Sequence, residues 1–270
     1  MVGFMTGTWP ELFDRLADRY DQVIPFFAEL AGQLLDVLDP DPGTRLLDIG
    51  SGRGAIAAAA AARGCAVTAV NAAPRMVSLL AAAHPAIDVR VMDIHRLDLP
   101  GASHDLVTGG FVIHLVTEPR RVLGELRRVL RPGASIALTV PGPCEDHGRW
   151  NAWNSLCAEF ASRAPERLPR RDLEVAAELR AAGFEDIRTV SLAVHLPVAD
   201  PRTCWDFHMS HGFARAVEAL DPADAAELRQ RALAELTRMH ASGGIMLDRG
   251  AVAYLATVPA SESPEPGRHS

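Results

Sequence analysis

Short apolar segments alternate with helix-like segments between residues 44 and 140. The apolar segments are rich in β-branched residues and lie at 45–49, 66–70, 89–92, 105–110 and 135–140. The stretches between them favour helices, with alanines at 55–62, an apolar face after Pro74, and apolar residues at helical spacing across 118–130. Strands that alternate with helices predict βαβ units and hence a parallel sheet covered by helices.

Helical patterns also flank this alternating region. Residues 11–21 and 25–38 precede it, residues 145–172, 173–182 and 201–240 follow it, and two further strands are expected near 185 and at 250–258. We predict one domain over residues 1–258, made of a helical cover at 1–43, a cofactor-binding core at 44–140, and helical lid insertions at 141–172 and 197–245. The Ser-, Pro- and Glu-rich tail at 259–270 is predicted to be disordered.

A glycine-rich turn follows the first predicted strand. Asp48 precedes Gly50, Gly52 and Gly54, and the alanine-rich helix begins directly afterwards. Glycine lets a ligand approach bare backbone, and the free N–H groups at the start of a helix then face that ligand. The spacing G-x-G-x-G departs from the dinucleotide fingerprint G-x-G-x-x-G, so it speaks against a nicotinamide oxidoreductase.

The form Asp-x-Gly-x-Gly-x-Gly closely resembles the first motif of the class I methyltransferases, which bind S-adenosyl-L-methionine (SAM). The run at 118–133, which ends in Arg131-Pro132-Gly133, resembles the ubiquinone-biosynthesis-type branch of small-molecule methyltransferases. This resemblance implies an α/β, Rossmann-like fold. Its doubly wound, seven-stranded sheet would be mostly parallel with the last strand antiparallel, and a helical N-terminal cover and lid insertions would be added to it.

The resemblance also implies which residues contact SAM. The glycine turn would supply backbone contacts, and an acid at the end of the second strand normally holds the ribose hydroxyls. This chain has Asn71 there, whose amide can still bond both hydroxyls. Asp93 would accept from the adenine amine, although it also suits a strand-end cap, and Met76 and Tyr20 have equally plain packing alternatives. The full set of expected cofactor contacts is Tyr20, Asp48, Gly50, Ser51, Gly52, Asn71, Ala72, Met76, Asp93, Ile94 and Phe111.

Histidines are the candidates for a catalytic base. Methyl transfer relies mainly on positioning, and a base is needed only when the acceptor arrives protonated. His114 follows the fourth strand on the reaction side, and His208 and His147 are the next candidates. His208 and His211 share a helix face, but no carboxylate pattern accompanies them, so no metal site is predicted.

Composition limits the possible substrate classes and cellular compartments of the protein. The 270-residue chain carries a net charge of −7, which speaks against a nucleic-acid substrate, and no apolar run is long enough to predict a membrane span. The four cysteines are scattered, and no signal peptide is evident. We therefore expect a cytoplasmic protein with a small-molecule substrate, and a homodimer is a further expectation.

The leading hypothesis is SAM-dependent methyl transfer to an O, N or C atom of a hydrophobic small molecule in specialised metabolism. Aromatic residues in the predicted lid, such as Trp150, Trp153 and Trp205, suit such an acceptor. The alternative is a protein of the same fold that binds SAM or its demethylated product but catalyses a non-methylating reaction such as cyclisation.

Overall fold

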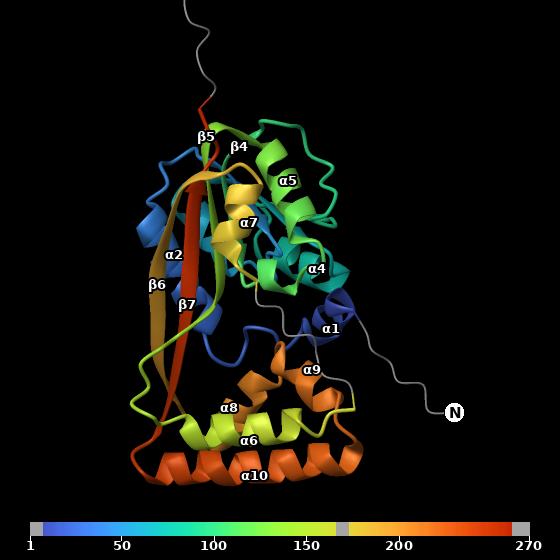
Figure 1. Ribbon diagram of the computed structural model, residues 1–270, viewed down its shortest axis with the longest axis vertical. Coiled ribbons are helices and arrows are strands. Elements are labelled where there is room, and N and C mark those ends of the chain that lie inside the picture. Colours follow the sequence, from blue (N-terminus) through green and yellow to red (C-terminus); the bar gives the residue numbers. More distant parts are fainter. Residues whose placement is uncertain (1–7, 166–172, 261–270) are drawn as a thin grey trace, which may run out of the picture.

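A computed structural model describes residues 8–165 and 173–260, and one seven-stranded sheet organises them (Figure 1). The strand order is β3-β2-β1-β4-β5-β7-β6. Strands β1 to β5 pair in parallel, and β7 runs antiparallel to both of its neighbours. The predicted fold class is thereby confirmed. The strands are β1 (Arg45–Ile49), β2 (Ala66–Asn71), β3 (Asp88–Val91), β4 (His104–Gly110), β5 (Leu130–Gly142), β6 (Glu185–Val198) and β7 (Ile245–Thr257).

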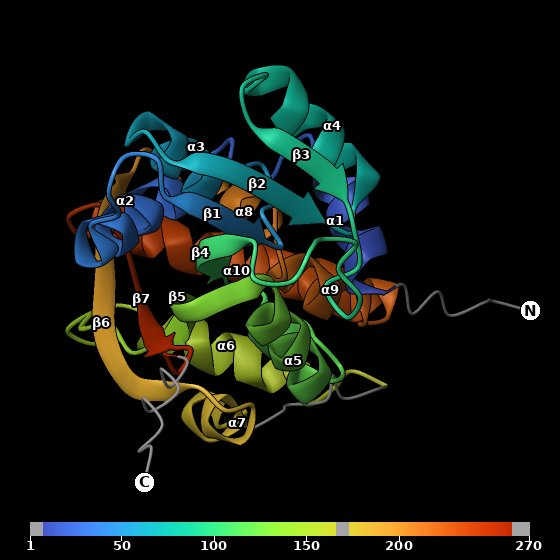
Figure 2. The same ribbon diagram turned by 90° about the horizontal axis from the view of Figure 1, so that it is seen from above.

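Helices cover both faces of this sheet, as Figure 2 shows from above. Helices α2 (Phe26–Leu38), α3 (Ala55–Ala62) and α4 (Pro74–Ala83) lie on one side. Helices α5 (Pro119–Val129) and α7 (Val175–Ala181) lie on the other side. The amphipathic pattern explains α5, because its apolar residues Val122, Leu123, Leu126 and Val129 are all fully buried.

A helical lid stands beyond the carboxyl ends of the parallel strands. It contains α6 (Asn151–Ala161), α8 (Pro201–His208), α9 (Phe213–Glu218) and α10 (Pro222–Ala241). Asp200 and Asp221 cap α8 and α10 by accepting hydrogen bonds from backbone N–H groups of the first helical turn. Strands β6 and β7 continue past the end of β5 to reach this lid, since residues 245–249 of β7 pair with β6 alone (Figure 1).

Two expected helices differ from the structure. The first helix, α1 (Trp9–Leu16), ends before Asp21, and the backbone reverses at Asp21 with φ of 54°. The helix expected over 145–172 is shorter, because the loop after β5 continues to Trp150 before α6 begins. Residues 166–172 of that expectation, and the tail from 261, lie outside the described residues. The single-domain division into cover, core and lid stays a prediction.

Candidate functional site

The glycine turn at the end of β1 requires glycine for steric reasons. Gly50, Gly52 and Gly54 have φ of 59°, 54° and 92°, a region that side chains rarely adopt. A Cβ on Gly50 would lie 2.6 Å from a methyl group of Val112, and one on Gly54 would collide with Leu80. The turn therefore holds its backbone close to the surrounding side chains and leads directly into the N-terminus of α3.

Asp48 is a buried carboxylate beneath this turn, with 1% of its surface exposed. Its Oδ1 accepts a hydrogen bond from the hydroxyl of Thr108 at 3.0 Å, and the carboxylate also accepts from the backbone N–H of Ala57 in α3. Burial raises the pKa of Asp48 to about 7, against 3.8 for a free side chain. Sequence reasoning missed Thr108, and only the register of β1 on β4, which pairs Asp48 with Thr108, reveals it.

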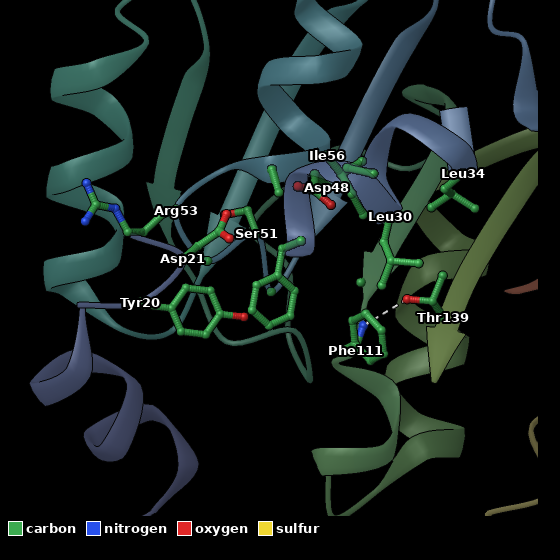
Figure 3. Close-up of a pocket in the computed structure, with 16 residues that line it drawn as sticks. Tyr20, Asp21, Leu30, Leu34, Asp48, Ser51, Arg53, Ile56, Phe111 and Thr139 are labelled. Atoms are coloured by element: carbon green, nitrogen blue, oxygen red, sulfur yellow. Dashed lines mark hydrogen bonds between the residues drawn. The ribbon is translucent and has the colours of Figure 1, made fainter. Parts of the chain in front are cut away.

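A cleft opens between the glycine turn, α2 and the end of β4 (Figure 3). Two polar atoms that line it are buried and have no partner, the hydroxyl of Ser51 and Oδ1 of Asp21. Burial raises the pKa of Asp21 to about 6. The residues that line the cleft are Tyr20, Asp21, Phe27, Leu30, Ala31, Leu34, Asp48, Gly50, Ser51, Gly52, Arg53, Ala55, Ile56, Gly110, Phe111 and Thr139. Asp21, Arg53 and Thr139 were not predicted, because a turn and a strand end carry no motif of their own.

Aromatic rings close the cleft from two elements. Tyr20 stacks on Phe27 with 4.9 Å between ring centroids, and a Cβ on Gly52 would meet the Tyr20 ring at 3.3 Å. Phe111 lies 5.9 Å from Phe27 and is held by Thr139, whose backbone oxygen and hydroxyl both accept from the Phe111 N–H. The predicted residues Tyr20, Asp48, Gly50, Ser51, Gly52 and Phe111 therefore surround one cleft.

The remaining expected contacts lie outside the cleft lining. Asn71 and Asp93 follow the adjacent strands β2 and β3, and each accepts a local hydrogen bond. Oδ1 of Asn71 accepts from the N–H of Ala73 at 2.9 Å, and Oδ1 of Asp93 accepts from the N–H of His95 at 2.9 Å.

The three apolar or small members of the set have different surroundings. Met76 is 1% exposed and packs with Ala17 and Ala73, and Ile94 belongs to the apolar core under β1. Ala72 is exposed at the end of β2. Met76 and Ile94 thus contact the protein interior, and neither lines the cleft.

The three candidate histidines have unlike surroundings. His114 lies in a short 3₁₀ helix (Ile113–Leu115) just after Phe111, its Nδ1 is buried without a partner, and burial lowers its pKa to about 4. His208 is buried in the lid, where it stacks on Trp153 at 4.6 Å. His147 is exposed, 3.5 Å from Glu145. His114 alone combines a place near the cleft with a free ring nitrogen.

His211 emerges as a further candidate. It follows α8, with its ring 4.7 Å from that of Phe207 and 6.1 Å from that of Phe27, which lines the cleft. Its Nδ1 is buried without a partner, and burial lowers its pKa to about 4. His208 and His211 were expected to share a helix face, but α8 ends at His208. Within residues 8–165 and 173–260, no cluster of side chains suits a metal ion and no helix is long and apolar enough to cross a membrane.

Comparison with known proteins agrees with this geometry. A family model for the methyltransferase domain matches residues 47–138. The nocamycin O-methyltransferase of Saccharothrix syringae is 32% identical, and the match covers 90% of this chain and 96% of that protein. A demethylmenaquinone methyltransferase of Clavibacter sepedonicus is 30% identical, over 67% of this chain and 84% of that protein. An aklanonic acid methyltransferase from a Streptomyces species is 31% identical over 48% of this chain and 64% of its own length.

Solved structures share the fold at low sequence identity. The YcgJ protein of Bacillus subtilis superposes with a TM-score of 0.57 at 16% identity, covering 85% of this chain and 98% of that one. A phosphoethanolamine N-methyltransferase of Haemonchus contortus, solved with S-adenosyl-L-methionine, has a TM-score of 0.57 at 15% identity, covering 96% of this chain and 61% of that one. With the glycine turn, the buried acid beneath it and a relative that matches nearly end to end, the chain belongs to the class I SAM-dependent methyltransferases.

Proposed function

We propose that the protein transfers a methyl group from SAM to an oxygen atom of an apolar small molecule of specialised metabolism. The near full-length match to a protein named nocamycin O-methyltransferase supports the choice of oxygen, and the aklanonic acid methyltransferase supports the class of metabolism. The observation that carries the proposal is the cleft itself, in which two buried carboxylates and an unpartnered hydroxyl meet a turn of bare backbone.

The residues around the cleft fit SAM in charge and shape. SAM supplies an electrophilic methyl group on a sulfonium, and it also carries an ammonium group. The carboxylates of Asp21 and Asp48 would attract these positive charges. Within the described residues, Oδ1 of Asp21 accepts no hydrogen bond. Ser51 and the backbone of Gly50 and Gly52 would hold the polar part of the cofactor, and Tyr20 would cover it.

The strand ends beside the cleft would hold the nucleoside. Asn71 and Asp93 lie at the carboxyl ends of adjacent parallel strands, where ligands of such sheets bind. Asn71 keeps its NH₂ group for a ribose hydroxyl while its oxygen bonds Ala73. Asp93 keeps Oδ2 for the adenine amine while Oδ1 bonds His95. Met76 and Ile94 act from beneath, by fixing the loops that carry these groups.

The acceptor would lie between the cleft and the lid. Phe111, Phe26 and Phe27 on the cleft side contact Phe207 and His211 on the lid side, with ring centroids 4.7–6.1 Å apart along this set. An acceptor held among these rings would be shielded from water and oriented against the methyl donor, and such positioning supplies most of the acceleration in methyl transfer. His114 is neutral at pH 7, because its pKa is low, and its free Nδ1 can take the proton of an acceptor hydroxyl.

Binding and turnover together test this proposal. Calorimetry with SAM and with S-adenosylhomocysteine (SAH) should give dissociation constants in the micromolar range, weakened at least tenfold by Asp21→Asn. Asp36→Asn, an exposed carboxylate on α2, is the matched control. SAH formation with a panel of phenols and carboxylic acids should then identify the acceptor oxygen. SAM binding without SAH formation on any acceptor would favour the non-methylating alternative, and absence of SAM binding would refute the proposal.

We further propose that the protein acts on a small molecule in the cytoplasm as a homodimer. The small-molecule substrate is supported by the acidic net charge and by the relatives, and the cytoplasm is supported by the scattered cysteines; neither feature bears on the dimer. Sedimentation velocity at two protein concentrations tests the dimer, and a monomer at both would refute it.

A further inference from the structure

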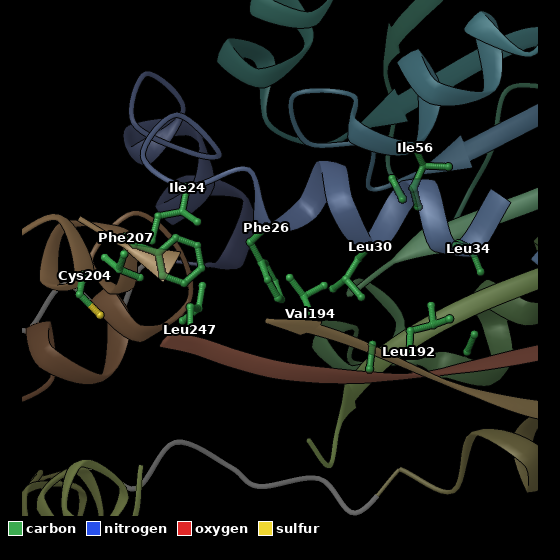
Figure 4. Packing of buried hydrophobic residues seen from close by; sticks show 14 of the residues in the cluster. Ile24, Phe26, Leu30, Leu34, Ile56, Leu192, Val194, Cys204, Phe207 and Leu247 are labelled. Atoms are coloured by element: carbon green, nitrogen blue, oxygen red, sulfur yellow. The ribbon is translucent and has the colours of Figure 1, made fainter. Parts of the chain in front are cut away.

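A half-buried arginine, Arg249, borders the apolar cluster that links the core to the lid. Arg249 is in β7, opposite Val194 of β6, on the same strand face as Leu247 and Ala251. Both of those neighbours are buried, and they belong to the cluster that Figure 4 follows from Leu34 and Ile56 beside the cleft to Phe207 and Leu247 in the lid. Burial lowers the pKa of Arg249, although arginine stays charged at any physiological pH.

No carboxylate in the described part of the chain forms an ion pair with this guanidinium, although Asp248 attracts it electrostatically from the neighbouring position. The neighbouring Asp248 points to the opposite strand face and is saturated there. It accepts from Arg149 at 2.8 Å and lies 2.6 Å from Nδ1 of His195. Among residues 8–165 and 173–260, no ion pair includes Arg249. A buried charge without a partner is costly, so a cation held in this state is typical of a ligand site.

The groups that do contact Arg249 are neutral. Nη1 donates to the backbone oxygen of Asp248 at 2.8 Å, and Nη2 lies 3.4 Å from Nε2 of His208. The guanidinium also lies over the ring of Trp150, 4.4 Å from its centroid. Burial lowers the pKa of His208 far below its usual value, so its ring is neutral and Nε2 accepts from the arginine. With only two of five N–H donors engaged, the guanidinium keeps donors for a ligand.

Nearby thiols do not supply the missing charge either. Cys157 and Cys204 are close enough to influence Arg249 electrostatically. Burial raises the pKa of Cys157 to about 11 and that of Cys204 to about 12, so both are protonated thiols at pH 7. The surroundings of the guanidinium are therefore aromatic and uncharged, which strengthens its attraction for an anion.

A path of aromatic rings joins Arg249 to the cofactor cleft. The ring of His208, which contacts the arginine, is 5.5 Å from that of Phe207. Phe207 is 5.7 Å from Phe26, and Phe26 is 6.0 Å from Phe111 in the cleft wall. These rings contact one another, so an acceptor with two or more fused rings would displace them to bring one end to the methyl donor and the other end to the guanidinium.

We infer that Arg249, together with His208 and Trp150, recognises an anionic group of the methyl acceptor, such as a carboxylate, at the end of the acceptor remote from the methylated atom. The inference rests on the proposed function, since it places the acceptor among the aromatic rings between the cleft and the lid. Arginine donates two parallel hydrogen bonds to a carboxylate, and Trp150 backs the guanidinium from one face. The acceptor is therefore an acidic, apolar ring compound, and its neutral analogues bind weakly.

A matched pair of probes tests this inference. Binding of 6-hydroxy-2-naphthoate, whose hydroxyl and carboxylate lie at opposite ends of the fused rings, and of its neutral carboxamide is measured in the presence of saturating SAH, with quenching of tryptophan fluorescence as the signal. The wild-type protein should bind the acid at least tenfold more tightly than the amide. Arg249→Met should abolish this preference, and Arg249→Lys, which keeps the charge but loses the planar fork, should retain part of it.

Control measurements separate this inference from the proposed function. Arg202→Met removes an exposed arginine from α8 and should leave the preference unchanged. SAH affinity, measured in parallel, should be the same in all variants. Equal binding of acid and amide by the wild type, binding of neither, or a preference that survives in Arg249→Met would overturn the inference while SAH binding stays intact. Loss of SAH binding in the wild type would instead count against the proposed function.

Discussion

Replacing Asp48 with asparagine should stabilise the free protein increasingly as the pH rises, while weakening its affinity for SAM. Asp48 is buried under the glycine turn, and its pKa is about 7 in the folded chain against 3.8 for a free side chain. Because the folded pKa is raised, the unfolded chain loses this proton first. The free energy of unfolding of the wild-type protein therefore falls progressively as the pH rises from 3.8 to about 7.

The magnitude follows from the size of this shift. The raised pKa corresponds to about 4 kcal/mol at pH 8, where Asp48 is ionised in both states, and to about 2 kcal/mol at pH 5. Asparagine removes this penalty. It has one acceptor oxygen for the Thr108 hydroxyl and the Ala57 N–H, and this shortage costs about 1–3 kcal/mol at every pH. The stability difference between variant and wild type should thus increase by about 2 kcal/mol from pH 5 to pH 8.

Urea unfolding at pH 5, 6, 7 and 8, followed by tryptophan fluorescence, measures this difference. Asp88→Asn is the control, because Asp88 is an exposed carboxylate on β3 that pairs with Arg90. Its stability difference from the wild type should not rise in the same way. A constant difference for Asp48→Asn across this range would refute the reasoning. With saturating SAM the stability advantage of the variant should shrink or reverse, because the variant loses a negative charge opposite the sulfonium and ammonium groups of the cofactor.

Replacing Asn71 with aspartate should tighten SAH binding about threefold to tenfold in calorimetry, since a carboxylate forms charge-assisted hydrogen bonds to a ribose diol. Unchanged affinity would argue against a ribose contact. His114→Gln should lower kcat about 100-fold with SAH affinity unchanged, and a parallel loss of both would indicate a structural role. Gly54→Ala should destabilise the fold by about 2–4 kcal/mol in urea unfolding, because φ is 92° and the new Cβ collides with Leu80. Gly124→Ala, with nothing within 4 Å of the new methyl group, should be neutral or stabilising.

Local signals explain why the sheet and the glycine turn could be predicted. Strands β1 and β2 are short apolar runs, α3 is a run of alanines, and α4 and α5 begin with proline. The turn from Asp48 to Gly54 combines an acid with three glycines whose positive φ no other residue adopts easily. These features depend on residues within a few positions of one another, so they can be recognised in the sequence without knowledge of the fold.

Other parts of the site depend on contacts that no local pattern encodes. Asp21 was expected in a helix, yet the helix ends at Leu16 and the following turn brings this carboxylate into the cleft. Thr108 acts on Asp48 only because β4 lies beside β1 in a particular register. Met76 has the residue type of an adenine contact and packs against Ala17, and its contact with the cofactor stays a prediction. Burial and register are global properties, and they decide these assignments.

The same distinction separates the two ends of the proposed active site. The centre of the cofactor end is a continuous segment, in which one motif supplies Asp48, Ser51 and the glycines, and residues such as Asp21 and Phe111 join it from other segments. The acceptor end joins Trp150, His208 and Arg249 from three distant segments, and they meet because β6 and β7 extend past β5 to carry the lid. Selection for a new acceptor can therefore change the lid residues without disturbing the cofactor turn. A common cofactor motif is thus compatible with many substrates, and the charge of the acceptor has to be inferred from the folded lid.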